Sequence, residues 1–336
     1  MEITEVSTEE WDRALPKTGF EVFHTPTALS VVDRHTDGEL RLFVGYKGDN
    51  AVAMFPVFVF ERAVGRAVLS PPPGMGIPQL GPLVMPASPK RRKRERLNRE
   101  FVETVVERCG VERRGSLCRV VCSPEYADPR PFAWAGMDVG TEFTYTLDTA
   151  DRSPDALLKA ASKSLRREVG DGREADVTVS VEGSDAAKRV YERTSDRYRE
   201  QGEEYAIERD YVTDLASALA ETSRCRVYVA RDPDGAFLSG VTVLYSNDAA
   251  YFWQGGTRAT YDGISINSLL HWRIVEDLAA DPPRPSTTTY DLLGANTERL
   301  CRYKSKFGGQ LVPYHVVESG GAPMNIAKKA YQLVGR

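Results

Sequence analysis

Residues 290–314, YDLLGANTERLCRYKSKFGGQLVPY, decide the fold of this chain. The stretch predicts a strand, a turn, a short helix, a second turn and another strand. Tyr290–Leu293 follow a run of threonines and end at a glycine, as a strand leaving a sheet does. A side-chain oxygen of Asn296 or Thr297 can cap the helix, and Gly308 can adopt the left-handed conformation that ends it.

The predicted helix places a lysine beside its apolar stripe. Leu300, Tyr303 and Phe307 share one face because they are spaced at i, i+3 and i+7. Lys304 follows Leu300 by one turn and lies at the edge of that stripe, whereas Lys306 is expected to point to solvent. A lysine at the rim of an apolar face either extends its ammonium into water or presents it to an anionic group in a cleft. For both lysines, compensation of the helix dipole is an alternative that needs no function.

This pattern resembles the C-terminal signature of the FemAB-type transferases, a branch of the GNAT superfamily that also includes BioF2-like acyltransferases. In that signature a strand ending in D-x-x-G/A precedes a helix with an F/Y-K-x-x-F-G-G run. The residues that carry the resemblance are Asp291, Gly294, Tyr303, Lys304, Phe307, Gly308 and Gly309. It implies an α/β (α+β) fold of two tandem GNAT-like units, each a mixed twisted sheet flanked by helices. It also implies that Lys304 is catalytic, stabilising an oxyanion or a phosphate of the donor or acceptor.

The order of predicted elements repeats along the chain. Each half predicts a strand, two helices, a three-stranded meander, a helix, a strand, a helical or irregular segment and a strand. A polar break after residue 150 separates the halves, so we expect an N-terminal unit at 1–150 and a C-terminal unit at 151–319. The tail 320–336 ends in an amphipathic segment and is expected to pack back on the first unit.

The composition limits the function classes. A length of 336 residues favours two domains, and a net charge of −4 argues against DNA binding through bulk charge. The start of the chain, MEITEVSTEEW, is too polar for a signal peptide, and no apolar run is long enough to cross a membrane, although peripheral membrane contact stays open. The five cysteines are odd in number and form no C-x-x-C pair, which predicts free thiols and a cytoplasmic protein. The run KRRKRER at 90–96 opens a helix, where either a bound anion or simple solvation would accommodate the cations.

The resemblance implies a cleft where two central strands part, here Ala250–Gln254 and Thr288–Leu293. Candidate substrate contacts beside that cleft, at the start of the central helix and at the cap of the short helix are Trp253, Gln254, Gly255, Tyr261, Asn267, Asn296 and Lys306. Polar residues are common at helix starts, so capping alone would also explain several of them.

Two further cationic motifs match the family. Arg209 and Tyr211, in IERDY, resemble an R-x-Y position near the phosphates of the acceptor; the alternative is an exposed arginine before a helix. Lys163, Arg166 and Arg167, in KSLRREV, match a K-x-x-R-R run and share one helical face, but the chain then turns to GDGREAD instead of continuing with a basic turn.

The donor stays open between acyl-CoA and aminoacyl-tRNA. The phosphate loop of acetyl-CoA-dependent GNAT enzymes, R/Q-x-x-G-x-G/A, is absent, and the corresponding segment is QGGTRATYDGIS. FemAB proteins also lack the loop, and known members use aminoacyl-tRNA. The histidines have no metal-ligand spacing, so we expect no metal, and no permanently bound cofactor is expected.

The leading hypothesis is an acyltransferase that forms an amide between an activated acyl or aminoacyl donor and an amine. The acceptor would be a small molecule or a cell-envelope or polysaccharide precursor. One alternative is an acetyl-CoA-dependent N-acetyltransferase with a degenerate CoA loop. Another is a non-catalytic GNAT-fold module that binds an anionic ligand. Acceptor, general base and oligomeric state are not predicted.

Overall fold

The computed structural model describes residues 1–62, 65–85, 88–113, 115–256 and 258–319. They form two compact units. Unit 1 comprises Met1–Pro73, Ile77–Glu142 and the described residues from Pro313 onward; unit 2 comprises Gly74–Gly76 and Phe143–Val312. The predicted border after residue 150 thus lies within unit 2, and the predicted packing of the tail 320–336 lies outside the described residues.

Unit 1 is built from α-helices of 5 to 18 residues and a sheet. Its elements are β1 (Glu2–Glu5), α1 (Thr8–Ala14), the 3-10 helix η1 (Val22–His24), α2 (Pro26–Arg34), β2 (Glu39–Lys47), β3 (Asn50–Arg62), β4 (Gly65–Ser70), β5 (Leu83–Val84), α3 (Arg91–Arg108), β6 (Leu117–Val121) and α4 (Arg130–Trp134). Two strands have residues in both units, namely β7 (Met137–Asp148) and β15 (Gln310–Ser319).

After two additional helices, unit 2 repeats this order of elements. They are α5 (Pro154–Ala160), α6 (Lys163–Glu174), β8 (Thr178–Glu182), α7 (Ala186–Glu200), α8 (Arg209–Glu221), β9 (Cys225–Arg231), β10 (Phe237–Tyr245), β11 (Ala249–Gly255), β12 (Thr260–Tyr261), β13 (Ile264–Ser265), α9 (Ile266–Ala280), β14 (Thr289–Asp291), α10 (Glu298–Lys304) and the 3-10 helix η2 (Ser305–Phe307).

The strand ladders of the two units have the same sequence of directions. In unit 1, β1, β2, β3 and β4 pair antiparallel in turn, β4 pairs parallel with β6, and β6 pairs antiparallel with β15. In unit 2, β8, β9, β10 and β11 pair antiparallel, β11 pairs parallel with β14, and β14 pairs antiparallel with β7. The repeat expected from the order of elements is therefore present. The last strand of each ladder comes from the other half of the sequence, which the order of elements could not predict.

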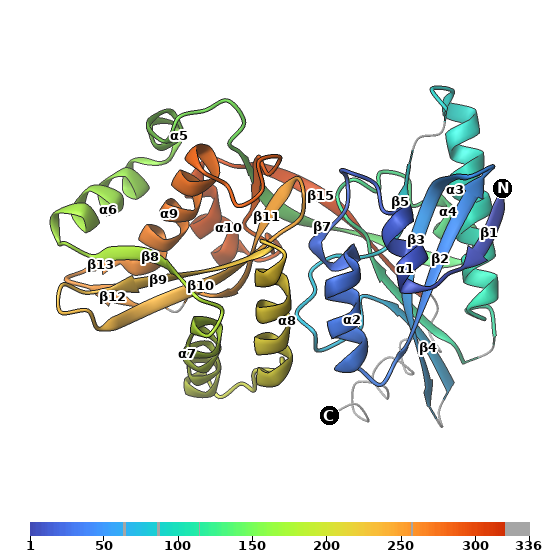
Figure 1. The fold of residues 1–336 in the computed structure, drawn as a ribbon, viewed down its shortest axis with the longest axis horizontal. Helices are drawn as coiled ribbons and strands as arrows, with labels where there is room; N and C mark the ends of the chain where they lie inside the picture. Colours follow the sequence, from blue (N-terminus) through green and yellow to red (C-terminus); the bar gives the residue numbers. More distant parts are fainter. Residues whose placement is uncertain (63–64, 86–87, 114, 257, 320–336) are drawn as a thin grey trace. The chain divides into compact units, whose positions relative to one another are not determined.

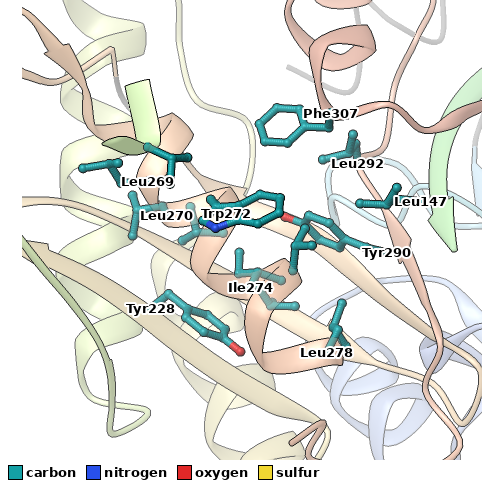
Figure 2. Packing of buried hydrophobic residues seen from close by; sticks show 14 of the residues in the cluster. Leu147, Tyr228, Leu269, Leu270, Trp272, Ile274, Leu278, Tyr290, Leu292 and Phe307 are labelled. Carbon is teal, nitrogen blue, oxygen red and sulfur yellow. The ribbon is translucent and has the colours of Figure 1, made fainter. Parts of the chain in front are cut away.

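In unit 2, helices cover both faces of the sheet (Figure 1). Helices α7 and α8 lie on one face, while α9, with α5 and α6 packed beside it, lies on the other. Figure 2 shows the core around α9, to which Trp272 and Ile274 of α9, Tyr290 of β14 and Phe307 of η2 all belong. Burial of this many large apolar side chains stabilises the unit and fixes α9 beside the C-terminal ends of β11 and β14.

The segment after residue 153 forms two helices in succession. Ser153 and Ser162 each accept a hydrogen bond from the backbone and cap these separate helices, α5 and α6. The glycine-containing run GDGREAD, which replaces the further basic turn of the family motif, continues α6 to Glu174. Gly172 of α6 is buried against α9, and an added Cβ at this position would collide with Leu269. The close packing of the two helices therefore explains this glycine.

Candidate functional site

The two central strands of unit 2 pair over a short distance and then part. The parallel ladder of β11 and β14 covers three pairs, from Ala249–Thr289 to Tyr251–Asp291. Beyond it, β11 continues along β10, whereas Leu292 donates its N–H to Tyr145 of β7 at 2.9 Å. The strands therefore separate where the sequence predicted a cleft.

A β-bulge and two glycines shape the β11 side of this gap. The register between β10 and β11 shifts at Trp253, since Thr242 pairs with Gln254 and Val243 with Phe252. Gly255 and Gly256 follow with φ of +107° and +73°. A Cβ on Gly255 would collide with the carbonyl oxygen of Gly240, so the chain can turn here only with glycine.

A cavity of about 660 Å³ opens at this bulge. Its walls are formed by β11, by the C-terminal part of α7 and the segment after it, by the N-terminal part of α9, and by α10. Its lining residues include Arg197, Tyr198, Tyr205, Trp253, Gln254, Gly255, Gly256, Arg258, Asn267, His271, Arg299, Tyr303 and Lys304. A volume of this size holds a substrate fragment of several tens of atoms. The structure thus brings Trp253, Gln254, Gly255, Asn267 and Lys304 together in one cavity, and their roles in binding or catalysis stay a prediction.

Several buried polar atoms in this cavity have no hydrogen-bond partner among the described residues. Gln254 is 3% exposed, and neither its Oε1 nor its Nε2 is bonded. The Oδ1 of Asn267 and the Nε of Arg197 are likewise unpaired. Their other polar atoms are held, because Asn267 Nδ2 and Arg197 Nη1 donate to the carbonyl oxygen of Gly256 at 2.9 and 3.1 Å. Buried polar groups are normally satisfied, so unpaired donors and acceptors facing one cavity indicate a ligand site.

The short helix α10 presents Lys304 to this cavity. Thr297 caps the helix by accepting from Leu300 N, and Gly308 ends the following turn with φ of +79°. Lys304 is 6% exposed, and its Nζ donates to the carbonyl oxygens of Leu293 and Gly294. Those carbonyls are free to accept because β14 has already ended at Asp291. The cap, the left-handed glycine and the inward lysine agree with the prediction for this helix.

Lys304 and Asp291 are both buried, and both have shifted pKa values. Burial lowers the pKa of Lys304 to about 8, although the nearby Asp291 carboxylate opposes the shift. Burial raises the pKa of Asp291 to about 6, against hydrogen bonds from Thr144 and from Leu293 N and the charge of Lys304. Both groups therefore titrate near neutral pH, which is typical of residues at functional sites.

Lys306 does not point to solvent, as was expected. Its Nζ lies 2.8 Å from Glu168 Oε2 and 2.7 Å from Ser268 Oγ, and 4.4 Å from the centroid of the Tyr303 ring. The α-helix ends at Lys304, and the 3-10 turn of η2 advances each residue by a larger angle, so Lys306 rotates toward α6 and α9. The contact of Lys306 with substrate stays a prediction. Its ammonium is already paired with the carboxylate of Glu168.

The remaining predicted residues lie apart from the cavity lining. Arg209 begins α8, is exposed and pairs with Asp210, while Tyr211 is buried and packs edge-on against Trp253. Lys163 is exposed, and Arg166 donates to the carbonyl oxygen of Ala161 at 2.6 Å. For these four, a role in binding phosphates stays a prediction.

Two more candidates have structural positions of their own. Tyr261 belongs to the small β12–β13 hairpin. Asn296 does not cap α10; its Oδ1 accepts from Phe143 N at 2.8 Å, which ties the loop after β14 to β7.

His271 is a cavity residue that the sequence argument missed. It lies on α9 with its Nδ1 2.7 Å from the hydroxyl of Tyr290, and its ring contacts Phe252, Tyr303 and Phe307. Burial, with the charges of Lys304 and Lys306, lowers the pKa of His271 to about 3, so the imidazole is neutral. A polar residue in the middle of the apolar central helix was the available signal.

The sequence argument also missed one arginine and two tyrosines from α7 and the segment after it, namely Arg197, Tyr198 and Tyr205. No motif marks them, because only the packing of α7 on β10 and β11 brings them to the bulge. Within the described part of the chain, no group of His, Cys, Asp or Glu side chains is arranged to hold a metal. The same residues contain no helix with the length and apolar character needed to span a membrane.

Comparison with known proteins places this cavity in a known type of domain. Residues 159–305 match the family model Acetyltransf_6, described as an acetyltransferase (GNAT) domain. No curated protein matches the chain by sequence.

Solved structures share the fold at low sequence identity. The crystal structure of FemX covers 100% of both chains with a TM-score of 0.73 and 12% identity. The C-terminal domain of a putative lysylphosphatidylglycerol synthetase from Agrobacterium fabrum covers 97% of this chain and 96% of its own, with a TM-score of 0.59 and 13% identity. A tandem GNAT protein from the clavulanic acid biosynthesis pathway covers 96% and 99%, with a TM-score of 0.51 and 14% identity.

The family model spans the whole of α7, β11, α9 and α10, whose residues line the cavity. The expected fold class, two GNAT-like units in tandem, is confirmed by the likeness to these structures, one of which is a tandem GNAT protein. The resemblance to FemAB-like GNAT proteins is thereby confirmed for the fold, and the match of residues 159–305 to an acetyltransferase (GNAT) domain supports an acyltransferase.

Proposed function

We propose that the chain transfers an aminoacyl group from an activated ester to an amine, in the cavity of unit 2. The observation that carries this proposal is the unpaired carboxamide of Gln254, 3% exposed, in the same cavity as Lys304. A carboxamide offers two donors and an acceptor, so its natural ligand has both kinds of group.

An aminoacyl group matches the unpaired atoms better than a simple acyl group does. Its α-ammonium can donate to Gln254 Oε1 and Asn267 Oδ1, and its carbonyl oxygen can accept from Gln254 Nε2. An acetyl group has one acceptor and no donor, which would leave both oxygens unpaired at a cost of about 1–3 kcal/mol each. The name of one relative of the same fold, a putative lysylphosphatidylglycerol synthetase, refers to an aminoacyl product, which agrees with this assignment.

The transfer itself needs a positioned donor and a stabilised oxyanion. The amine nitrogen of the acceptor bonds to the ester carbonyl carbon, and the carbonyl oxygen becomes an oxyanion. The ammonium of Lys304 supplies the positive charge that favours this intermediate, inside a cavity where charge interactions are stronger than in water. The ester C–O bond then breaks, and the proton of the amine passes to the leaving oxygen.

The donor we propose is aminoacyl-tRNA, with a precursor of the cell envelope or of a polysaccharide as the amine acceptor. Arg197, Arg258 and Arg299 line the cavity and suit the phosphates of either substrate. Five cysteines without disulfides agree with a cytoplasmic location, where charged tRNA is available.

A second candidate function is acetyl transfer from acetyl-CoA. The observation in favour of acetyl transfer is that residues 159–305 match a family model described as an acetyltransferase (GNAT) domain. In this case the unpaired oxygens of Gln254 and Asn267 would have to be satisfied by the acceptor or by water.

Two matched ligands separate these functions. They are 3′-alanylamino-adenosine and 3′-propionylamino-adenosine, stable amides that differ in the α-amine alone. We expect the full chain to bind the first at least about tenfold more tightly, measured by calorimetry, because the ammonium completes two hydrogen bonds. The preference should be lost in Gln254→Leu, while Lys159→Gln, at an exposed position of α5, should keep it.

The transfer assay uses the same logic. Charged tRNA and acetyl-CoA are offered with a nucleotide-linked muropeptide as the amine acceptor, and the product is identified by its mass. A product with an added amino acid supports the proposal. Equal binding of the two adenosine ligands together with acetylated product would overturn it in favour of acetyl transfer.

A further inference from the structure

The first half of α3, in unit 1, carries an excess of positive charge that the fold does not use. Between residues 90 and 99 the sequence has seven basic side chains and one acidic one, in a chain with a net charge of −4. The first turn of α3 holds no acidic residue, so its cations oppose the helix dipole. Arg91 and Arg99 pair with Glu95 and Glu103, four residues further on.

The other cations at this end of α3 have no partner among the described residues. Arg92, Lys93, Arg94 and Arg96 are exposed and form no hydrogen bond or ion pair through their side chains. Arg92, Arg96 and Arg99 are spaced at i, i+4 and i+7, so they follow one outward stripe, opposite the buried face of Phe101, Val102 and Val105. We call this row, with Lys93, the basic stripe.

Apolar groups flank the basic stripe on both sides. On one side lies Trp134 of α4, which is 54% exposed, with the guanidinium groups of Arg99 and Arg130 each 5.5 Å from its ring centroid. On the other side is a small hollow of about 130 Å³, where Met1, Val84 and Leu97 lie beside Lys93, Arg94 and Arg96. Glu100 also lines this hollow, and its charge is taken by the amino terminus of Met1 at 3.2 Å.

We propose that the basic stripe and Trp134 dock unit 1 onto a bilayer surface that contains anionic phospholipid. Cations next to an anionic leaflet attract it, and a tryptophan prefers the boundary between headgroups and acyl chains. Apolar groups on both sides of a row of cations fit a surface that is charged at its headgroups and apolar below them.

RNA is the other polyanion that this surface could meet, and the geometry favours it less. Phosphates require cations but no apolar border. A base could stack on Trp134 only by displacing a guanidinium that already lies over the ring. The proposal does not depend on the chemistry of the unit 2 cavity, so either can fail without the other.

The test measures binding of the full chain to vesicles made of equal parts phosphatidylcholine and phosphatidylglycerol. Each basic side chain near an anionic leaflet contributes about fivefold to the partition coefficient. We therefore expect Arg92→Gln/Lys93→Gln/Arg96→Gln to bind on the order of 10²-fold more weakly than the wild type, and pure phosphatidylcholine vesicles to bind neither. The matched control Lys159→Gln/Lys188→Gln/Arg193→Gln removes three exposed charges from unit 2 and should change the partition coefficient by less than about threefold.

Trp134 gives a site-specific second measurement, since Trp11, Trp253 and Trp272 are buried. On vesicles with brominated acyl chains we expect quenching of tryptophan emission that disappears in Trp134→Phe. The proposal would be overturned if Arg92→Gln/Lys93→Gln/Arg96→Gln and the control variant bound the vesicles equally well. Vesicle binding by the wild type without this quenching would also overturn it. So would binding of a single-stranded RNA oligonucleotide that quenches Trp134 in the absence of any vesicle binding.

Discussion

The two units contain the same ladder but use its parallel pair differently. In unit 1, the chain after β4 returns to close the space beside β6: Leu80 bridges to Cys122 and donates its N–H to Val121 at 2.9 Å. Gly81 lies so close that an added Cβ would meet Cys122 Cα at 3.0 Å. In unit 2, the bulge at Trp253 and the glycines after it leave a cavity of about 660 Å³ at the corresponding strands.

The buried histidines of the units show the same contrast. In unit 1, Glu21 N donates to His24 Nδ1 at 3.1 Å, so His24 Nε2 carries the proton and donates to Gly81 O at 3.1 Å. In unit 2, His271 contacts Tyr290 through Nδ1 and lines the cavity. Unit 1 also holds buried oxygens without a partner, on Gln79 and Ser123, but they do not line its described hollow. In unit 1, the closed unit, the chain after β4 fills the space beside the parallel strands β4 and β6. In unit 2, the open unit, the parallel strands β11 and β14 part and leave a cavity.

The largest expected effect comes from removing the ammonium in the open unit. Lys304→Met should lower kcat/KM for amide formation by about 10²–10³-fold, as loss of an oxyanion-stabilising donor does elsewhere. Because burial lowers the pKa of Lys304 to about 8, the wild-type kcat/KM should fall as pH rises through that value. His24→Gln, in the closed unit, is the comparison variant and should keep kcat/KM within about twofold. A rate that rises through the same pH range would mean that the neutral amine of Lys304 is the active form.

Acid should unfold the closed unit through its histidine. Burial lowers the pKa of His24 to about 4 from its ordinary 6.5, so the unfolded chain takes up this proton first as pH falls. Stability from the neutral imidazole is complete above about 6.5 and is lost toward pH 4, by about 3 kcal/mol in total. Urea unfolding at pH 7 and at pH 5, followed by circular dichroism, should show this loss together with that from His271, whose pKa burial lowers to about 3, and His24→Gln should remove the part due to His24. An unchanged pH dependence in His24→Gln would show that other groups carry the acid sensitivity.

The sequence predicted much of the fold because local signals and packing agree there. The caps and left-handed Gly308 around α10, the glycines after β11 and the repeat of elements all follow from short-range rules. Lys304 could be placed beside an apolar stripe for the same reason.

What the sequence did not predict depends on tertiary packing. The direction of Lys306 followed from a change to 3-10 geometry that no residue in KSKFGG marks. Arg197 and Tyr205 reach the cavity only through the position of α7 on the sheet, and Tyr211 is buried against Trp253 rather than set beside Arg209 at a surface. The exchange of β7 and β15 between the units is likewise set by strand pairing far apart in sequence.

The smallest expected effect separates a binding group from a structural one. Gln254 is buried with both ends of its amide unpaired, which costs free energy in the unliganded protein. Gln254→Leu keeps the approximate volume and removes that cost, so we expect the free energy of unfolding to rise by about 1 kcal/mol while ligand binding weakens. His24→Leu is the matched variant in the closed unit, and it should destabilise by about 1–3 kcal/mol because Glu21 N and Gly81 O lose their partner. Urea unfolding at pH 7 measures both. If Gln254→Leu destabilised the protein as His24→Leu does, the amide would be part of the structure, and the contrast between an open and a closed unit would lose its main support.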